Sequence, residues 1–226
     1  MTYVLSDIHG FWGEYNDFLD AVNFSDNDRL YIIGDVIDRG SDGIQILQDI
    51  MARQNIVMTL GNHEEMNLFT FKELCRCSKS VQSEIIRDEV EMQAIGQEDT
   101  LYSFCQLSPK ERQTIIDYIS ALPLYQEVTV NSQEYFLVHA GLPDFSEHGD
   151  IEFYSGEELL FGEHDFTERH IDNTTVIVGH VPTRFISGAE PDKIFRCGDS
   201  IAIDCGLGFG GQLGVLCLET GEEFYF

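Results

Sequence analysis

Short apolar runs alternate with amphipathic segments along the first 64 residues, and this alternation restricts the fold more than any other feature. The apolar runs cover residues 3–5, 30–33 and 56–60. The segments between them, 14–22 and 41–53, carry apolar side chains at helical spacing. A strand–helix–strand–helix–strand order of this kind brings the strands together in parallel. The first part of the chain is therefore predicted to form an α/β unit.

The rest of the chain changes from helical to strand-like composition at Pro123. Residues 65–122 contain no strand-like run, and Ser108-Pro109-Lys110-Glu111 has the cap, proline and glutamate of a helix start. This segment is predicted to be an insertion of three or four helices. Strand-like runs follow at 124–130, 134–139, 174–178, 200–203, 212–218 and 222–226. They predict a second, mixed or antiparallel sheet, and so an α/β (α+β) fold in which two packed sheets lie between helices.

The chain carries a large excess of negative charge, which limits the partners it can bind. Its 226 residues include 40 acidic and 13 basic side chains, which gives a formal net charge of −27. Such a surface repels polyanions, so neither nucleic acid nor an anionic membrane is an expected partner. Metal ions and basic peptide segments are compatible with it. The length suits one domain over residues 1–226.

Neither a targeting segment nor a membrane span is visible in the sequence. No run approaches the roughly 18 apolar residues of a transmembrane helix, and no signal-peptide pattern opens the chain. The six cysteines are scattered and form no metal-binding pair, so we read them as small apolar side chains. A reduced, cytoplasmic location is expected, and the sequence does not indicate an oligomeric state.

Five of the apolar runs end directly on polar residues that can bind metal ions. The following motifs are Ser6-Asp7-Ile8-His9-Gly10, Gly34-Asp35-Val36-Ile37-Asp38-Arg39-Gly40, Gly61-Asn62-His63-Glu64, His139-Ala140-Gly141 and Gly179-His180. Ligands of open α/β sheets bind at the carboxyl ends of the strands. Any one of these residues could be an ordinary turn or cap residue, but together they predict a shared site.

The donor atoms in these motifs are oxygens and imidazole nitrogens, without sulfur. This set suits hard to borderline divalent ions, with Mn²⁺ expected first and Fe or Zn²⁺ as alternatives. The number of donors exceeds one tetrahedral site and suits two ions that share a bridging carboxylate. The predicted metal ligands are Asp7, His9, Asp35, Asn62, His139 and His180.

The motifs DIHG, GDVIDRG, GNHE, HAG and GH, in this order, resemble the phosphoprotein phosphatase family of calcineurin-like metallophosphoesterases. Its bacterial Ser/Thr and Tyr phosphatases and its symmetrical diadenosine tetraphosphatases are the nearest in pattern. The resemblance implies a β-sandwich flanked by helices. It also implies that Asp7 and His9 hold a first metal, that Asp35 bridges, and that the second metal is held by Asn62, His139 and His180.

The resemblance further implies the roles of the remaining charged residues. His63 would be the general acid, paired with Asp38, while a metal-bound hydroxide attacks phosphorus. Arg39, with Asn62, would bind the phosphate of the substrate. An imidazole beside a carboxylate and a guanidinium fork are chemically suited to these roles. An alternative for Arg39 is an ion pair with Asp38 or Asp42.

One departure from the family pattern lies between HAG and GH. Bacterial members carry an arginine there as a second phosphate clamp, whereas this chain has Leu159-Leu160-Phe161-Gly162-Glu163. Arg169 is a possible substitute. His148, His164 and His170 lie in the same polar stretch and are predicted to be surface residues.

The leading functional prediction is dimetal hydrolysis of phosphate monoesters, with phosphoserine or phosphothreonine in proteins as the substrate. Symmetrical hydrolysis of diadenosine tetraphosphate is the alternative, because it would use the same metal ligands. The net charge tilts the prediction towards proteins, since a nucleotide with four phosphates is itself a polyanion. A phosphate-binding regulatory protein with reduced turnover is a third possibility, suggested by Glu163.

Overall fold

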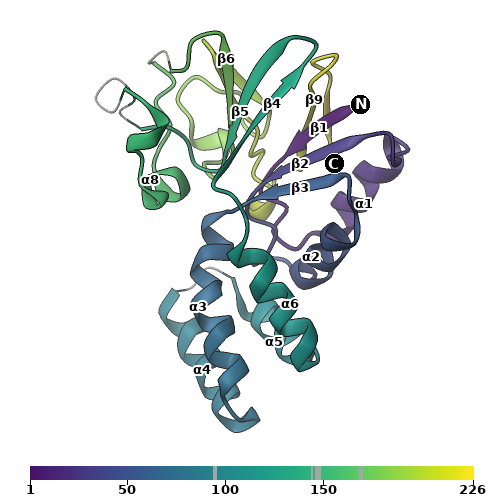
Figure 1. Cartoon of the computed structure of the whole chain (residues 1–226), viewed down its shortest axis with the longest axis vertical. Helices are drawn as coiled ribbons and strands as arrows, with labels where there is room; N and C mark the ends of the chain where they lie inside the picture. The colour runs from purple at the N-terminus through teal and green to yellow at the C-terminus, as the bar shows by residue number, and fades with distance from the viewer. Residues whose placement is uncertain (94–95, 144, 146–148, 168–169) are drawn as a thin grey trace.

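Two five-stranded sheets form the centre of the molecule, shown in Figure 1. The computed structural model describes residues 1–226 except 94–95, 144, 146–148 and 168–169. The strand order is β10-β9-β1-β2-β3 in one sheet and β4-β5-β6-β8-β7 in the other. This arrangement confirms the predicted two-sheet α/β (α+β) fold. That residues 1–226 make a single domain remains a prediction.

The first sheet combines the predicted parallel unit with two strands from the end of the chain. Strands β1 (Thr2–Leu5), β2 (Arg29–Ile33) and β3 (Ile56–Thr59) are parallel, as predicted. However, β9 (Gly214–Cys217) pairs antiparallel with β1, and β10 (Glu223–Tyr225) pairs with β9. The expectation that the last two strands join the second sheet was therefore wrong, because periodicity identifies a strand without identifying its neighbour.

The second sheet is mixed and contains one strand that the sequence did not indicate. Strands β4 (Tyr125–Val130), β5 (Gln133–Val138), β6 (Thr174–Val178) and β8 (Ser200–Ala202) match predicted runs. The additional edge strand β7 (Phe195–Cys197) is only three residues long and pairs antiparallel with β8. It is too short to show an alternation of apolar and polar residues in the sequence.

Side chains alternate between the two faces of each sheet and so create separate apolar layers. On β1, Val4 points into the core between the sheets, whereas Leu5 joins the core under the helices. On β6, Ile177 enters the same inter-sheet core and Val178 packs on the outer face. Helices α1 (Trp12–Ala21) and α2 (Gly43–Ala52) cover the outer face of the first sheet. The short helix α8 (Gly156–Phe161) lies against the second.

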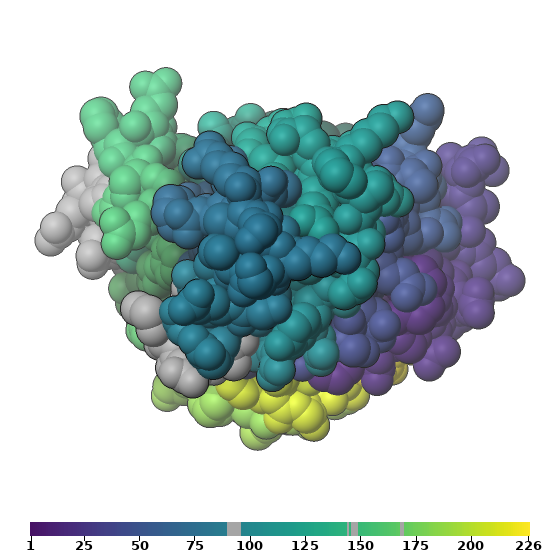
Figure 2. Space-filling model, turned by 90° about the horizontal axis from the view of Figure 1, so that it is seen from below, coloured from purple at the N-terminus to yellow at the C-terminus, as the bar shows by residue number. Residues whose placement is uncertain are grey.

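The predicted insertion forms a helical lobe below the sheets, which covers the centre of the face seen in Figure 2. Its described helices are α3 (Asn62–Arg76), α4 (Lys79–Gln93), α5 (Glu98–Gln106) and α6 (Pro109–Ser120). The Ser108–Glu111 capping box at the start of α6 is confirmed. None of the helices in the described ranges is long and apolar enough to cross a membrane.

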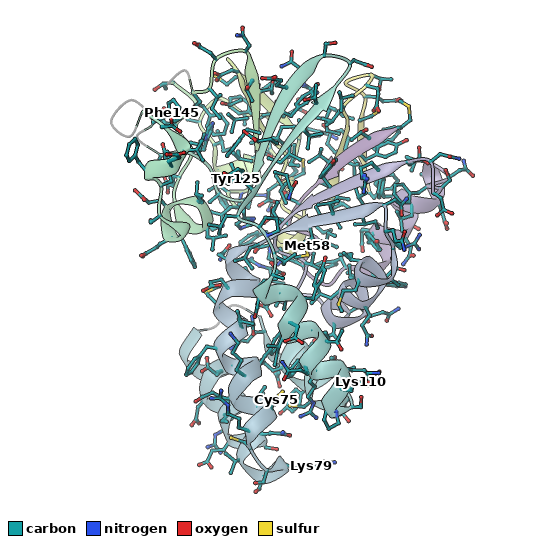
Figure 3. The ribbon with its side chains drawn as sticks, viewed as in Figure 1. Met58, Cys75, Lys79, Lys110, Tyr125 and Phe145 are labelled. Atoms are coloured by element: carbon teal, nitrogen blue, oxygen red, sulfur yellow. The ribbon has the colours of Figure 1, made fainter. Side chains whose placement is uncertain are left out.

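Two stacked phenylalanines hold the lobe together. Phe71 of α3 and Phe104 of α5 are fully buried, and their rings stack with centroids 4.0 Å apart and an interplanar angle of 10°. In Figure 3, Met58 of β3 lies near the junction of the lobe with the sheets, and Lys79 lies at the far end. The stack of Phe71 on Phe104 packs α5 against α3 inside the lobe.

Replacing Phe104 by alanine is expected to lower the free energy of unfolding by about 3–5 kcal/mol, because it leaves a cavity in a packed core. Urea denaturation measures the effect. Phe69→Ala on α3 is the matched control, since Phe69 is 66% exposed and its loss should cost less than about 0.5 kcal/mol. Equal costs for the two variants would show that the stack does not stabilise the lobe.

Candidate active site

The residues that follow the strands meet at one edge of the sheets, as the sequence predicted. Two groups of metal-binding atoms lie there, each with all its atoms within 4.8 Å of one another. One group contains His9, Asp35 and His63, and the other contains Asp35, His139 and His180. Asp35 belongs to both groups, which is the position required of a bridging carboxylate.

The six predicted metal ligands are all in this place. His9 Nε2 lies 3.8 Å from Asp7 Oδ1 and 3.8 Å from Asp35 Oδ2. On the other side, the Asn62 Oδ1 atom lies 2.8 Å from His139 Nε2 and 3.0 Å from His180 Nδ1. The donor atoms therefore form two adjacent groups, one around His9 Nε2 and one around Asn62 Oδ1.

Four of these ligands have a left-handed backbone, which few residues other than glycine adopt. The φ angles are +53° at Asp7, +49° at His9, +55° at Asp35 and +65° at His180. Such conformations persist only where the surrounding structure fixes them, and they concentrate at functional sites. Here the His9 N–H donates to the Asp35 carbonyl at 3.0 Å, which ties two of the loops together.

The donor set fits metal ions because its lone pairs face one another. The Nδ1 atoms of His9 and His139 lie 3.0 and 2.8 Å from the carbonyl oxygens of Ile37 and Ile33. A neutral imidazole has one N–H, so each Nε2 then directs a lone pair into the site. Burial lowers the pKa of His9 to about 3, so its ring is neutral at pH 7. Cations between the donors would turn these repulsive contacts into attractive ones.

Buried carboxylates at the same place also require positive charge. Asp35 is 2% exposed, and burial, with the nearby Asp7 and Glu64 carboxylates, raises its pKa well above the usual range. The Oδ1 atom of Asp7 is buried without a hydrogen-bond partner in the described part of the chain. An ionised carboxylate is very costly to bury unless it is paired or binds a metal. The site is therefore built to hold cations.

Glu64 organises the loop that carries Asp35, although the sequence analysis assigned it no role. Its fully buried carboxylate accepts hydrogen bonds from the backbone N–H groups of Asp35 at 2.9 Å, Val36 at 2.9 Å and Ile37 at 3.2 Å. It also accepts from Gly61 at 3.2 Å. A Cβ atom at Gly61 would lie 2.3 Å from the Asp35 nitrogen, so only glycine fits here. The sequence signal for this role is a glutamate at the third position of a helix that follows a glycine cap, because such a glutamate can accept hydrogen bonds from backbone N–H groups at the helix start.

The predicted His63–Asp38 pair is present and buried, with 3% of His63 and none of Asp38 exposed. His63 Nδ1 lies 2.6 Å from Asp38 Oδ2, which also accepts from Asn67 Nδ2 at 2.8 Å. Burial opposes protonation, but the Asp35 and Asp38 carboxylates outweigh it and raise the pKa of His63. Its Nε2 atom lies 3.8 Å from Asp35 Oδ2 and so faces the metal-binding groups. Asn67 was missed because an asparagine inside a helix carries no sequence signal.

Arg39 presents its guanidinium group against an aromatic ring. Its Cζ atom lies 4.0 Å from the centre of the Phe209 ring, and its backbone N–H donates to the Gly96 carbonyl at 2.6 Å. Among the described residues, none accepts a hydrogen bond from its Nε atom. The alternative ion pairs with Asp38 and Asp42 do not form within that part of the chain. The guanidinium is therefore available for an anion.

Two predicted surface histidines are buried instead. His164 and His170 are 9% and 5% exposed, and their rings stack with centroids 4.3 Å apart. His164 Nε2 lies 2.8 Å from Ser200 Oγ, and burial lowers its pKa to about 3. The polar sequence around them concealed this packing, which only the fold of the second sheet creates. His148 and Arg169 lie outside the described residues.

Comparison with known proteins agrees with this geometry. The family model of the calcineurin-like phosphoesterases matches residues 2–205. A curated relative from Nitrosomonas europaea, named symmetrical bis(5'-nucleosyl)-tetraphosphatase, is 28% identical over 166 residues. The match covers 72% of this chain and 53% of that protein, so the chain spans about half the length of this relative.

Solved structures of two kinds share the fold. A protein with the provisional name diadenosine tetraphosphatase has a TM-score of 0.70 and 19% identity, with 100% of this chain and 92% of that chain covered. A protein serine/threonine phosphatase from Saccharomyces cerevisiae has a TM-score of 0.57 and 16% identity, with 100% and 79% covered. At these identities the likeness concerns the fold alone. Since the family model spans nearly the whole sequence, the chain belongs to the calcineurin-like phosphoesterase family.

Proposed function

We propose that the protein is a hydrolase that uses two divalent metal ions to cleave dinucleoside tetraphosphates symmetrically. The observation that carries the proposal is the pair of donor groups that share Asp35. The substrate is supported by the name of the curated relative from Nitrosomonas europaea. This name supports dinucleotide hydrolysis, the alternative prediction from the sequence, better than it supports phosphoprotein hydrolysis.

The metal ions would be held as the sequence predicted. Asp7 and His9 would hold the first, Asn62, His139 and His180 would hold the second, and Asp35 would contribute to both. Bound at these positions, Mn²⁺, Fe or Zn²⁺ would supply an activated water and neutralise the charge that develops on the phosphoryl oxygens. Mn²⁺ is the first expectation because three of the six donor residues supply oxygen, while the three imidazoles also suit Fe or Zn²⁺.

His63 acts as the general acid in this proposal. A water that has lost one proton to solvent adds its oxygen to one of the two central phosphorus atoms. The bond that breaks joins this phosphorus to the oxygen shared with the other central phosphorus atom. The Nε2 proton of His63 passes to that leaving oxygen, and two nucleoside diphosphates result. The hydrogen bond from Nδ1 to Asp38 fixes the ring and keeps it protonated until transfer.

Arg39 would bind the non-bridging oxygens of the reacting phosphate. The stack on Phe209 fixes the plane of the guanidinium, which can then donate two parallel hydrogen bonds. Asn62, one residue from His63, would contact the same phosphate. Glu163 offers no such contact because its charge has the wrong sign.

Phosphoserine or phosphothreonine in proteins is the second candidate substrate. The net charge favoured it in the sequence, but net charge is a poor guide to one site, because salt screens charges beyond about 8 Å. The local field depends on the metal ions and on Arg39. The buried His63–Asp38 pair supports turnover over a purely regulatory role.

Removal of metal ions is expected to abolish activity. The protein should hydrolyse p-nitrophenyl phosphate with Mn²⁺, lose this activity in EDTA and regain it when Mn²⁺ is restored. Metal analysis should find two ions per chain, and fewer in His180→Ala, because that ring is one of the donors at the second position. Full activity after exhaustive chelation would contradict the proposed metal centre.

Replacing His63 by asparagine is expected to lower kcat for phenyl phosphate by roughly 10²–10⁴, the range for loss of a general acid. The loss should be smaller for p-nitrophenyl phosphate, whose leaving group is a stronger acid and needs less protonation. Metal content should stay unchanged. A fall in metal content would instead identify His63 as a ligand, which its place in the first donor group also allows.

Direct comparison of substrates tests the choice between the two candidates. With diadenosine tetraphosphate, ADP should be the only product, and kcat/KM should exceed that for phosphoserine and phosphothreonine peptides. Chromatography separates ADP from the ATP and AMP of asymmetric cleavage. A higher kcat/KM for the phosphopeptides would instead support protein phosphatase activity, the leading prediction from the sequence.

A further inference from the structure

A cavity of about 350 Å³ opens directly beside the metal-binding donors. Its wall includes Ala140, which follows His139, and Gly179 and Val181, which flank His180. A group bound in this cavity would therefore be adjacent to the second metal position. The proposed chemistry uses none of the side chains that form the rest of the wall.

Most of the described wall is apolar, and two phenylalanines and the ring of His164 belong to it. Phe166 packs edge-on against Phe195, with ring centroids 5.4 Å apart, and against His164 at 4.8 Å. These contacts fix the orientation of its ring. Phe185 also lines the cavity but is 65% exposed. An exposed aromatic ring at the rim of an apolar cavity is suited to stacking on a flat ring.

The cavity is connected to the phosphate-binding arginine through aromatic contacts. The Arg39 guanidinium lies over the Phe209 ring, and that ring packs perpendicular to Phe185, with centroids 6.0 Å apart. A ligand could therefore place a phosphate on Arg39 and a flat apolar ring against Phe185. Nucleotides have this construction, because a ribose joins the base to the phosphates.

Glu163 gives the cavity an acceptor of hydrogen bonds. It lines the wall together with Thr167, and no described residue makes a hydrogen bond or ion pair with its carboxylate. A carboxylate repels phosphate but accepts strongly from N–H groups. It would favour a base with an exocyclic amino group, such as adenine, over uracil, which presents carbonyl oxygens on both sides of its ring N–H.

We propose that this cavity binds one nucleobase of the substrate, stacked on Phe185 and held through its exocyclic amino group by Glu163. The inference rests on the proposed function, because it assumes a nucleotide whose phosphates reach the metal centre. It explains why a glutamate occupies the position at which a second phosphate-binding arginine was expected. Glu163 would select the base, and Arg39 would bind the phosphate.

Calorimetric binding to the Mn²⁺-loaded protein tests the inference independently of turnover. ADP should bind at least about tenfold more tightly than pyrophosphate, since stacking of a base on an aromatic side chain is typically worth this much. Phe185→Ala should remove most of that difference. Phe153→Ala is the matched control, because Phe153 is 71% exposed and does not line the cavity. Its ADP affinity should equal that of the unchanged protein.

The role of Glu163 is tested by comparing two bases. The unchanged protein should bind ADP more tightly than UDP, and Glu163→Ala should reduce that preference to less than about twofold, whereas the exposed-surface control Glu157→Ala should keep it. Equal affinities for ADP and pyrophosphate, or an unchanged ADP affinity in Phe185→Ala, would overturn the inference. Failure of the proposed function is a separate result, namely the absence of dinucleotide cleavage in a protein that still binds ADP in this manner.

Discussion

The Glu64 carboxylate is the interaction on which the site depends. It is fully buried, and it accepts hydrogen bonds from four backbone N–H groups in two different loops. These bonds fix the loop after β2 against the first turn of α3, so that the N–H of His63 reaches Asp35 Oδ1 at 3.0 Å. One buried carboxylate therefore positions both Asp35, the proposed bridging ligand, and His63, the proposed general acid.

The helical lobe also supports the site through its contacts with Asp38 and Arg39. Thr100 of α5 accepts from the Asp38 N–H at 3.0 Å, and the carbonyl of Gly96 accepts from the Arg39 N–H. Asn67 of α3 holds the Asp38 carboxylate. Since Asp38 and Arg39 both have left-handed backbones, with φ of +70° and +67°, these bonds are needed to keep them in place. The insertion is therefore part of the framework of the active site.

The candidate site has a charged part and an apolar part, which suit different parts of a ligand. Under the proposed function, the metal positions and Arg39 would attract phosphate even though the formal net charge of the chain is −27, because nearby groups outweigh distant ones in the local field. The cavity beside them, near His180, is mostly apolar. Its Glu163 carboxylate would repel phosphate and accept hydrogen bonds from N–H groups. This arrangement is why we propose a substrate with a charged centre and flat apolar ends in preference to a phosphate on a flexible peptide side chain.

The sequence by itself determined the parallel unit, the helical insertion and the six donors that gather at the metal positions, because periodicity and strand-end residues are local signals. It also indicated the His63–Asp38 pair through resemblance. The tertiary structure alone decided that β9 and β10 join β1, that His164 and His170 are buried, and that Phe185 and Phe209 meet. These features depend on contacts between residues far apart in the chain. Local patterns cannot specify such contacts, since pairing and burial depend on which distant surfaces fit together.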